Sequence, residues 1–167
     1  TAKDGSGVSA SCTVIVKEKP EITDVFFEND TYEAKVGDRI SLNLYVDCEN
    51  QDYYAESYGS FRCVSSKSSV ASYYGYYTPY WSSSKQRWVY GVSVNCLAPG
   101  EVTFTATTKD GSGVSGSCTI VVRPAPDSIS LSHAQLVLNS SGVGNQRQLE
   151  YIFEPANSLD TVRWSSS

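Results

Sequence analysis

The chain has 167 residues and a formal net charge of −5, and 12% of its residues are aromatic. The aromatic content excludes a disordered tail, and the 13 Lys and Arg are scattered singly, so no basic stripe exists for a nucleic acid partner. No apolar run approaches the roughly 18 residues of a membrane-spanning helix, and we expect no membrane insertion in this segment.

Strand patterns dominate the chain. Apolar and polar residues alternate with period two, in chain order, at residues 22–27, 39–46, 89–94, 102–108, 114–122 and 149–153. Turn signals separate them, and KDGSG at residues 109–113 supplies the glycines of a tight hairpin, so the strands on either side of it should pair antiparallel. No helical stripe of period 3.6 is present. About seven short strands per module predict an all-β antiparallel sandwich.

The chain contains an internal repeat. Residues 1–16 read TAKDGSGVSASCTVIV and residues 107–122 read TTKDGSGVSGSCTIVV, identical at 12 of the 16 positions. Each copy is followed by a joint containing proline, KEKPE in the first case and RPAPD in the second. Self-similarity of this kind indicates a repeating structural module.

The repeat divides the chain into three parts. Residues 1–16 are the closing strand of a preceding module, residues 21–123 are a complete module, and residues 127–167 are the first strands of a following module. Neither end fragment can bury its own apolar face, because isolated strands need further strands to be stable. We therefore expect neighbouring modules as partners, supplied either by a longer array in the same chain or by adjacent chains.

Four motifs carry a resemblance to a known family: VGD-x-x-x-L at residues 36–42, LAPG-x-x-x-F at 97–104, KDGSGVS-x-SCT-x-x-V in both copies of the repeat, and TVRWSSS at 161–167. Together they resemble the bacterial immunoglobulin-like domain of group 2 type, found in tandem in surface proteins and adhesins of the intimin and invasin kind. The resemblance covers nearly the full chain. It implies an immunoglobulin-like sandwich, an extracellular location on a bacterial surface or secreted fibre, and a spacer or adhesive role.

The middle module departs from the family pattern by two enlarged segments, residues 49–60 and 73–88, and nine of the twelve Tyr lie between residues 53 and 90. Tyr, Ser and Gly in loops are typical of antibody paratopes, and flat aromatic faces suit sugar rings. The segments are therefore candidates for contact with a host glycan or protein receptor, through Tyr73, Tyr74, Tyr76, Tyr77, Tyr80, Trp81 and Trp88. The alternative, which stays open, is an extra hairpin whose aromatic pairs pack over the sandwich.

The cysteines raise a question of pairing. In an oxidising compartment Cys48 and Cys63 are the local disulfide pair, because they flank the first enlarged segment, while Cys63 with Cys96 is the alternative across the two sheets. Cys12 and Cys118 are equivalent positions of the repeat, and we expect both thiols to point into a core and stay free.

Catalytic and metal chemistry have little support. His133 is the only histidine, and no serine has a positioned base beside it, so a nucleophile triad is not expected. The acidic residues near the first joint lack a D-x-D-x-D-G calcium loop, and we expect neither a metal nor a cofactor.

The sequence therefore predicts a non-enzymatic stalk segment with an adhesive Tyr-rich surface. Two alternatives stay open, namely a purely structural spacer in a phage virion or surface fibre, and an accessory module of a secreted carbohydrate-active enzyme.

Overall fold

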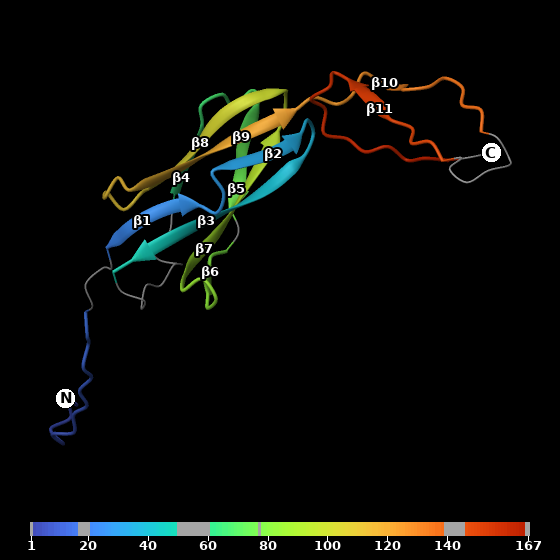
Figure 1. Ribbon diagram of the computed structural model, residues 1–167. Coiled ribbons are helices and arrows are strands. Elements are labelled where there is room, and N and C mark those ends of the chain that lie inside the picture. Colours follow the sequence, from blue (N-terminus) through green and yellow to red (C-terminus); the bar gives the residue numbers. More distant parts are fainter. Residues whose placement is uncertain (1, 17–20, 50–60, 77, 139–145, 166–167) are drawn as a thin grey trace.

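The computed structural model describes residues 2–16, 21–49, 61–76, 78–138 and 146–165, and this part of the chain contains strands and no helix (Figure 1). The strands are β1 (Ile22–Phe27), β2 (Thr31–Lys35), β3 (Arg39–Cys48), β4 (Phe61–Ser65), β5 (Ala71–Tyr76), β6 (Tyr80–Ser82), β7 (Arg87–Cys96), β8 (Gly100–Thr108), β9 (Ser115–Arg123), β10 (Ser128–Leu131) and β11 (Tyr151–Glu154). Residues 50–60, which are all but the first residue of the enlarged segment at 49–60, lie outside the described residues.

Strands β1 to β9 form two sheets. The first, called sheet A, has the order β1-β3-β7-β5 with β6 also on β7, and the second, called sheet B, has the order β2-β9-β8-β4. All pairs are antiparallel except β2 and β9, which run parallel. This is the strand arrangement of an immunoglobulin-like sandwich, so the predicted fold class is confirmed. The predicted hairpin at residues 109–113 is also confirmed, since β8 pairs with β9 and Gly111 and Gly113 have positive φ.

The core lies between the inward faces of the two sheets. On β3 the alternate residues Leu42, Leu44 and Val46 are at most 1% exposed, and Phe104 of β8 and Ile120 of β9 are 0% exposed. These residues are buried together because successive side chains of a strand point to opposite faces. Each such side chain contributes roughly 1.5–3 kcal/mol of transfer free energy on burial.

Strand β9 crosses β1 at unusually close range. A Cβ atom added to Gly116 of β9 would lie 2.2 Å from the carbonyl oxygen of Val25 and 2.9 Å from the Cα of Phe26. Backbone atoms cannot rotate away as a flexible side chain can, so only glycine fits this position at this separation. The glycine thereby lets β9 cover the inward face of β1.

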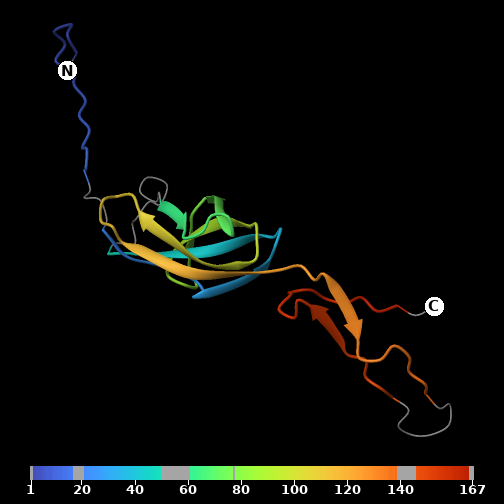
Figure 2. The same cartoon turned by 90° about the horizontal axis from the view of Figure 1, so that it is seen from above.

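The sandwich has two distinct ends. Ile22 of β1 pairs with Cys48 at the end of β3, and we call this the leading end. At the opposite, trailing end, Lys35 pairs with Arg123 of β9, and the amide of Val36 donates a 3.1 Å hydrogen bond to the Arg123 carbonyl. The 10 residues of β3 run between these ends, a length of about 30 Å. The chain thus enters at the leading end and leaves at the trailing end (Figure 2).

Residues 2–16 lie beyond the leading end and form a turn without a strand. The turn reproduces the β8–β9 turn: the hydroxyl of Ser6 donates to Asp4 Oδ1 at 2.6 Å, and that of Ser112 donates to Asp110 Oδ1 at 2.6 Å. The strand expected after this turn is not formed, because none of the described strands pairs with these residues.

The C-terminal hairpin, β10 paired antiparallel with β11, lies beyond the trailing end (Figure 1). The TVRWSSS motif begins at residue 161, and residues 161–165 form no strand. Trp164 nevertheless packs its ring against that of Tyr151, with centroids 6.3 Å apart. An ion pair of 3.6 Å between Lys35 Nζ and Asp160 Oδ1 connects the hairpin to the sandwich.

Candidate functional site

The Tyr-rich segment forms strands on sheet A. Residues 71–76 are β5, and residues 80–82 form β6, which pairs with the start of β7. The extra hairpin considered as an alternative in the sequence analysis is therefore present. It does not exclude binding, because several of its aromatic residues are exposed.

The candidate binding residues do not form one patch. Tyr73 and Tyr74 are 37% and 59% exposed and lie at a β-bulge of β5 towards the trailing end. The bulge places an extra residue in the strand, and the guanidinium carbon of Arg39 lies 3.8 Å from the centroid of the Tyr74 ring. Tyr77 and the side chain of Tyr76 lie outside the described residues.

The other candidates lie at the leading end. Trp81 of β6 is directly opposite Trp88 of β7, and the rings make an edge-to-face contact with centroids 5.8 Å apart. Such a pair stabilises a hairpin by about 0.5–1.5 kcal/mol beyond the burial of area. Tyr80, the neighbour of Trp81, is 56% exposed and points to the opposite face of sheet A.

A pocket of about 220 Å³ opens beside the tryptophan pair. It is lined by Val46, Asp47, Cys48, Trp81, Gln86, Arg87 and Trp88. Arg87 and Asp47 form an ion pair of 3.5 Å at its edge, between Nε and Oδ1. Gln86, in the tight turn before β7, has the positive φ of 54° that only a minority of residues other than glycine adopt. The pocket thus combines flat aromatic rings with a carboxylate, a guanidinium and an amide.

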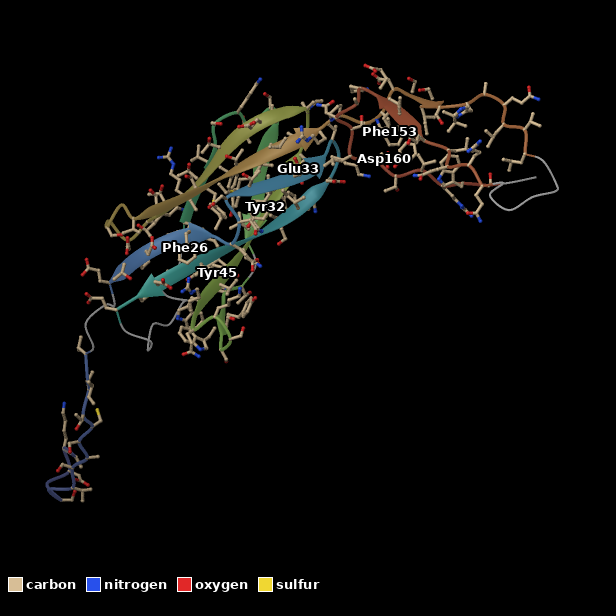
Figure 3. The ribbon with its side chains drawn as sticks, in the orientation of Figure 1. Phe26, Tyr32, Glu33, Tyr45, Phe153 and Asp160 are labelled. Carbon is tan, nitrogen blue, oxygen red and sulfur yellow. The ribbon has the colours of Figure 1, made fainter. Side chains whose placement is uncertain are left out.

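A second cluster, which was not predicted from the sequence, covers the outer face of sheet A. Tyr45 and Phe26 lie side by side on β3 and β1, with ring centroids 5.5 Å apart (Figure 3). The hydroxyl of Tyr45 donates to Glu28 Oε1 at 2.6 Å, and the amide of Asn43 donates to Glu28 Oε2 at 2.7 Å. The guanidinium of Arg87 lies over the Phe26 ring at 4.9 Å.

These hydrogen bonds perturb the titration of the cluster. Two hydrogen bonds lower the pKa of the Glu28 carboxyl below its ordinary value, and the one from Tyr45 has a larger effect than the one from Asn43. Burial is the larger cause, and the hydrogen bond to Glu28 the smaller, of the rise in the pKa of Tyr45 to about 12. Glu28 is therefore charged and Tyr45 neutral at pH 7, as their hydrogen bond requires. The cluster joins β1, β3 and β7 and has no arrangement for proton transfer.

The signal for this outer cluster was present in the sequence. Phe26 precedes Phe27, and Tyr45 stands between Leu44 and Val46. Large apolar residues of β1 and β3 therefore point to both faces of the sheet. A strand with one solvated face alternates strictly, and consecutive apolar residues indicate that both faces are covered.

The five cysteines are free thiols. Cys118 is 3% exposed and points into the core as expected, whereas the same expectation is wrong for Cys12, which is exposed because residues 8–16 have no strand partner. Burial raises the pKa of both Cys48 and Cys63 to about 11, so neither thiol is an activated nucleophile. Cys48 and Cys63 both lie towards the leading end and face inward, whereas Cys96 ends β7 at the trailing end.

The described residues contain no group of three or more His, Cys, Asp or Glu placed to hold a metal ion. His133 is exposed and its Nδ1 lies 3.1 Å from the Ser132 hydroxyl. Within the same residues no helix has the length and apolar character to cross a bilayer.

No protein-family model matches the chain, and no curated protein matches it. Among solved structures it is similar to domains 4 and 5 of the S-layer protein SbsC, with a TM-score of 0.46 and 18% identity over 65% of this chain and 56% of that chain. It is also similar to SbsC domains 4–9, with a TM-score of 0.48 and 15% identity over 84% of this chain and 21% of that chain.

A larger SbsC fragment, residues 31–844, gives a TM-score of 0.47 and 15% identity over 89% of this chain and 18% of that chain. The chain thus spans little more than half the length of the first of these structures, at 56%, and about a fifth of the other two. At TM-scores below 0.5 these likenesses support no statement about family or function. The resemblance to the group 2 immunoglobulin-like domain remains a prediction from the sequence.

Proposed function

We propose that the chain is a non-enzymatic, extracellular segment of a bacterial surface protein, built from tandem immunoglobulin-like modules that act as a stalk. The module boundaries of this proposal are residues 1–16, 21–123 and 127–167. The observation that carries it is the position of the two ends of the sandwich. A module that the chain enters at one end and leaves at the other adds its length to an array, whereas a module with adjacent termini adds mostly width.

The repeat in the sequence supports the same proposal. The two copies begin 106 residues apart, at residues 1 and 107, and each is followed by a joint containing proline. Proline restricts the backbone and so limits bending at each joint. An array of such modules extends by about 30 Å for each repeat, the length of β3.

Duplication of the repeat unit tests the stalk. In the duplicated chain a second copy of residues 17–122 follows residue 122, so that every junction keeps its natural sequence. Small-angle X-ray scattering should give a maximum dimension larger by about 30–40 Å. The matched control replaces the new KEKPE joint by Gly and Ser and should give a shorter average dimension. An unchanged maximum dimension in the duplicated chain contradicts the stalk.

Antibodies against the folded module should also label intact cells, as the proposed location requires.

We also propose a recognition role for this module, with a glycan as the ligand, and it rests on the leading-end pocket. Trp81 and Trp88 offer flat faces on which a sugar ring stacks. The carboxylate of Asp47 accepts hydrogen bonds from sugar hydroxyls, and the guanidinium of Arg87 donates them. Tyr80 points to the opposite face of sheet A from Trp81 and lies outside the pocket. Tyr74 lies at the other end of β5–β7 and is not part of this site.

A glycan array tests the recognition role with three proteins. Wild type should bind a defined subset of glycans, Trp81→Ala should lose that binding by at least tenfold in affinity, and Tyr74→Ala should bind as wild type does. The Tyr74 variant removes an exposed aromatic ring of the same sheet, so it controls for general stickiness. Equal binding by all three proteins, or none by wild type, refutes the recognition role and leaves the stalk untouched.

A further inference from the structure

The leading-end pocket lies where β3 and β7 separate. The last pair of their ladder is Val46 with Trp88, although β3 continues to Cys48. Each strand keeps its other neighbour, since Cys48 pairs with Ile22 of β1 and Arg87 pairs with Ser82 of β6. Apart from Trp81, the pocket is lined by residues 46–48 and 86–88, which flank this gap on its two sides.

The main-chain groups of Cys48 face the gap. In an antiparallel sheet, the N–H and C=O of one residue point to the same neighbouring strand, and those of the next residue point to the opposite one. The Asn43 carbonyl of β3 accepts a 2.9 Å hydrogen bond from the Glu28 amide, on the β1 side. The Glu49 amide donates to the Glu21 carbonyl at 3.2 Å, also on the β1 side. The even-numbered residues between them, Cys48 included, therefore turn their main-chain groups towards β7.

Gln86 ends the ladder and forms the other side of the gap. In a regular ladder the next hydrogen-bonded pair after Val46 and Trp88 would be Cys48 with Gln86. Gln86 has a φ of 54°, which is not an extended conformation, so the pairing stops. Its side-chain Nε2 donates a 2.6 Å hydrogen bond to the Ser83 carbonyl, which leaves Oε1 as the acceptor of that amide. A main-chain donor and an amide acceptor thus flank the pocket from opposite sides.

The charges around the gap favour an uncharged ligand. Asp47 and Arg87 compensate each other in their ion pair. Burial first, and then the carboxylates of Asp47 and Asp110, raise the pKa of the Cys48 thiol to about 11, so two negative charges act on this region. An acidic sugar would be repelled by them.

We propose that the sugar bound at this pocket is a neutral N-acetylated hexosamine, recognised through its acetamido group by Cys48 and Gln86. In a trans amide the C=O and N–H point in opposite directions, as a group that spans two sides of a gap requires. The acetyl oxygen accepts from the main-chain N–H of Cys48, and the acetamido N–H donates to Gln86 Oε1. The sugar ring stacks on the tryptophan pair. This inference rests on the proposed recognition role and adds the class of sugar to it.

Two related sugars should bind less well, and each for a stated reason. The parent hexose has a single hydroxyl in place of the acetamido group, which is too short to span the gap. The free hexosamine has a protonated amine and no carbonyl to accept from Cys48. A site built to hydrogen-bond a ligand group discriminates against analogues that lack it, because its own polar groups are then left unpaired.

NMR titration of the full chain measures this preference. The probes are the methyl glycosides of N-acetylglucosamine and N-acetylgalactosamine, each beside its parent hexose and its free amine. Wild type should bind at least one N-acetylated glycoside about tenfold more tightly than its two counterparts. The amide proton of Cys48 should shift on addition of that glycoside and not on addition of the parent hexose.

Gln86→Gly isolates the role of the side-chain amide. Glycine suits the positive φ at this position, so the variant should fold as wild type does. Its preference for the N-acetylated glycoside should fall to about twofold or less, while its affinity for the parent hexose is unchanged. Ser84→Ala is the matched control, because it removes a hydroxyl of the same turn that does not line the pocket, and it should keep the full preference.

The outcomes separate this inference from the recognition role itself. Wild type that binds the parent hexoses as tightly as the N-acetylated glycosides, a Cys48 amide that does not shift, or a Gln86→Gly variant that keeps the preference would each overturn the inference and leave the recognition role standing. Wild type that binds no glycan of the array refutes the recognition role, and the inference is overturned with it.

Discussion

Gly116 offers the sharpest test of how the sandwich is packed. A methyl group at this position would lie 2.2 Å from the Val25 carbonyl oxygen, whereas carbon and oxygen atoms in close contact are normally about 3.3 Å apart. Gly116→Ala must therefore push β9 away from β1 by about 1 Å. A gap of that size forfeits up to about half of the dispersion attraction between the facing side chains.

The expected loss of stability follows from that displacement. Forcing packed strands apart lowers the free energy of unfolding by about 2–3 kcal/mol. Alanine also restricts the unfolded chain more than glycine does, but this raises the free energy of unfolding by only about 0.4–1 kcal/mol. For a module of about 100 residues, the midpoint of thermal unfolding should fall by about 10–20 °C. Near-ultraviolet circular dichroism or calorimetry measures this midpoint directly.

Gly75→Ala is the matched control. Gly75 also lies in a strand, and nothing is within 4 Å of an added Cβ, so the substitution should change stability by no more than about 0.5 kcal/mol. If the two variants unfold within about 2 °C of each other, the close crossing of β1 and β9 does not limit packing.

Two further predictions concern ionisation and oxidation. Because Tyr45 and Asn43 hold the pKa of Glu28 below its ordinary 4.5, its stabilising effect is present above that pH and is lost as the pH falls through the depressed pKa. Urea midpoints of wild type and Glu28→Gln should therefore differ at neutral pH and converge as the pH falls through the depressed pKa of Glu28, and a constant difference would contradict this linkage. Mild oxidation should join Cys48 to Cys63 and bring both thiols out of reach of alkylation, while a peptide map showing Cys63 bound to Cys96 would contradict the assignment.

The two copies of the repeat show what sequence alone could predict. The turn of KDGSG is set by local residues, since the Asp–Ser hydrogen bond has the same 2.6 Å length in both copies. The strand that follows is set by its surroundings. In the second copy Ile120 is buried between β2 and β8, whereas in the first copy Val14 is 78% exposed and no strand forms.

The candidate site was harder to predict than the fold. Aromatic enrichment selected Trp81 and Trp88, which line the pocket, together with Tyr74, which lies at the far end of the sheet from them. Composition does not tell which face or which end of a sheet a residue takes. The outer cluster around Tyr45 depends on Glu28 and Asn43, which meet only because β1 and β3 pair in one particular register. Register comes from tertiary packing, and a local pattern cannot supply it.

The parallel pair β2 and β9 determines how the module carries tension. Force applied to the two ends of the sandwich pulls β2 towards the leading end and β9 towards the trailing end, so the two strands are loaded in shear. The backbone hydrogen bonds along the 5 residues of β2 must then break together. An antiparallel hairpin pulled from its open end instead breaks its backbone hydrogen bonds one after another. Single-molecule pulling from residues 21 and 124 should therefore need a higher force than pulling the β8–β9 hairpin from its open end. Equal forces in the two geometries would exclude a load-bearing role for this pair.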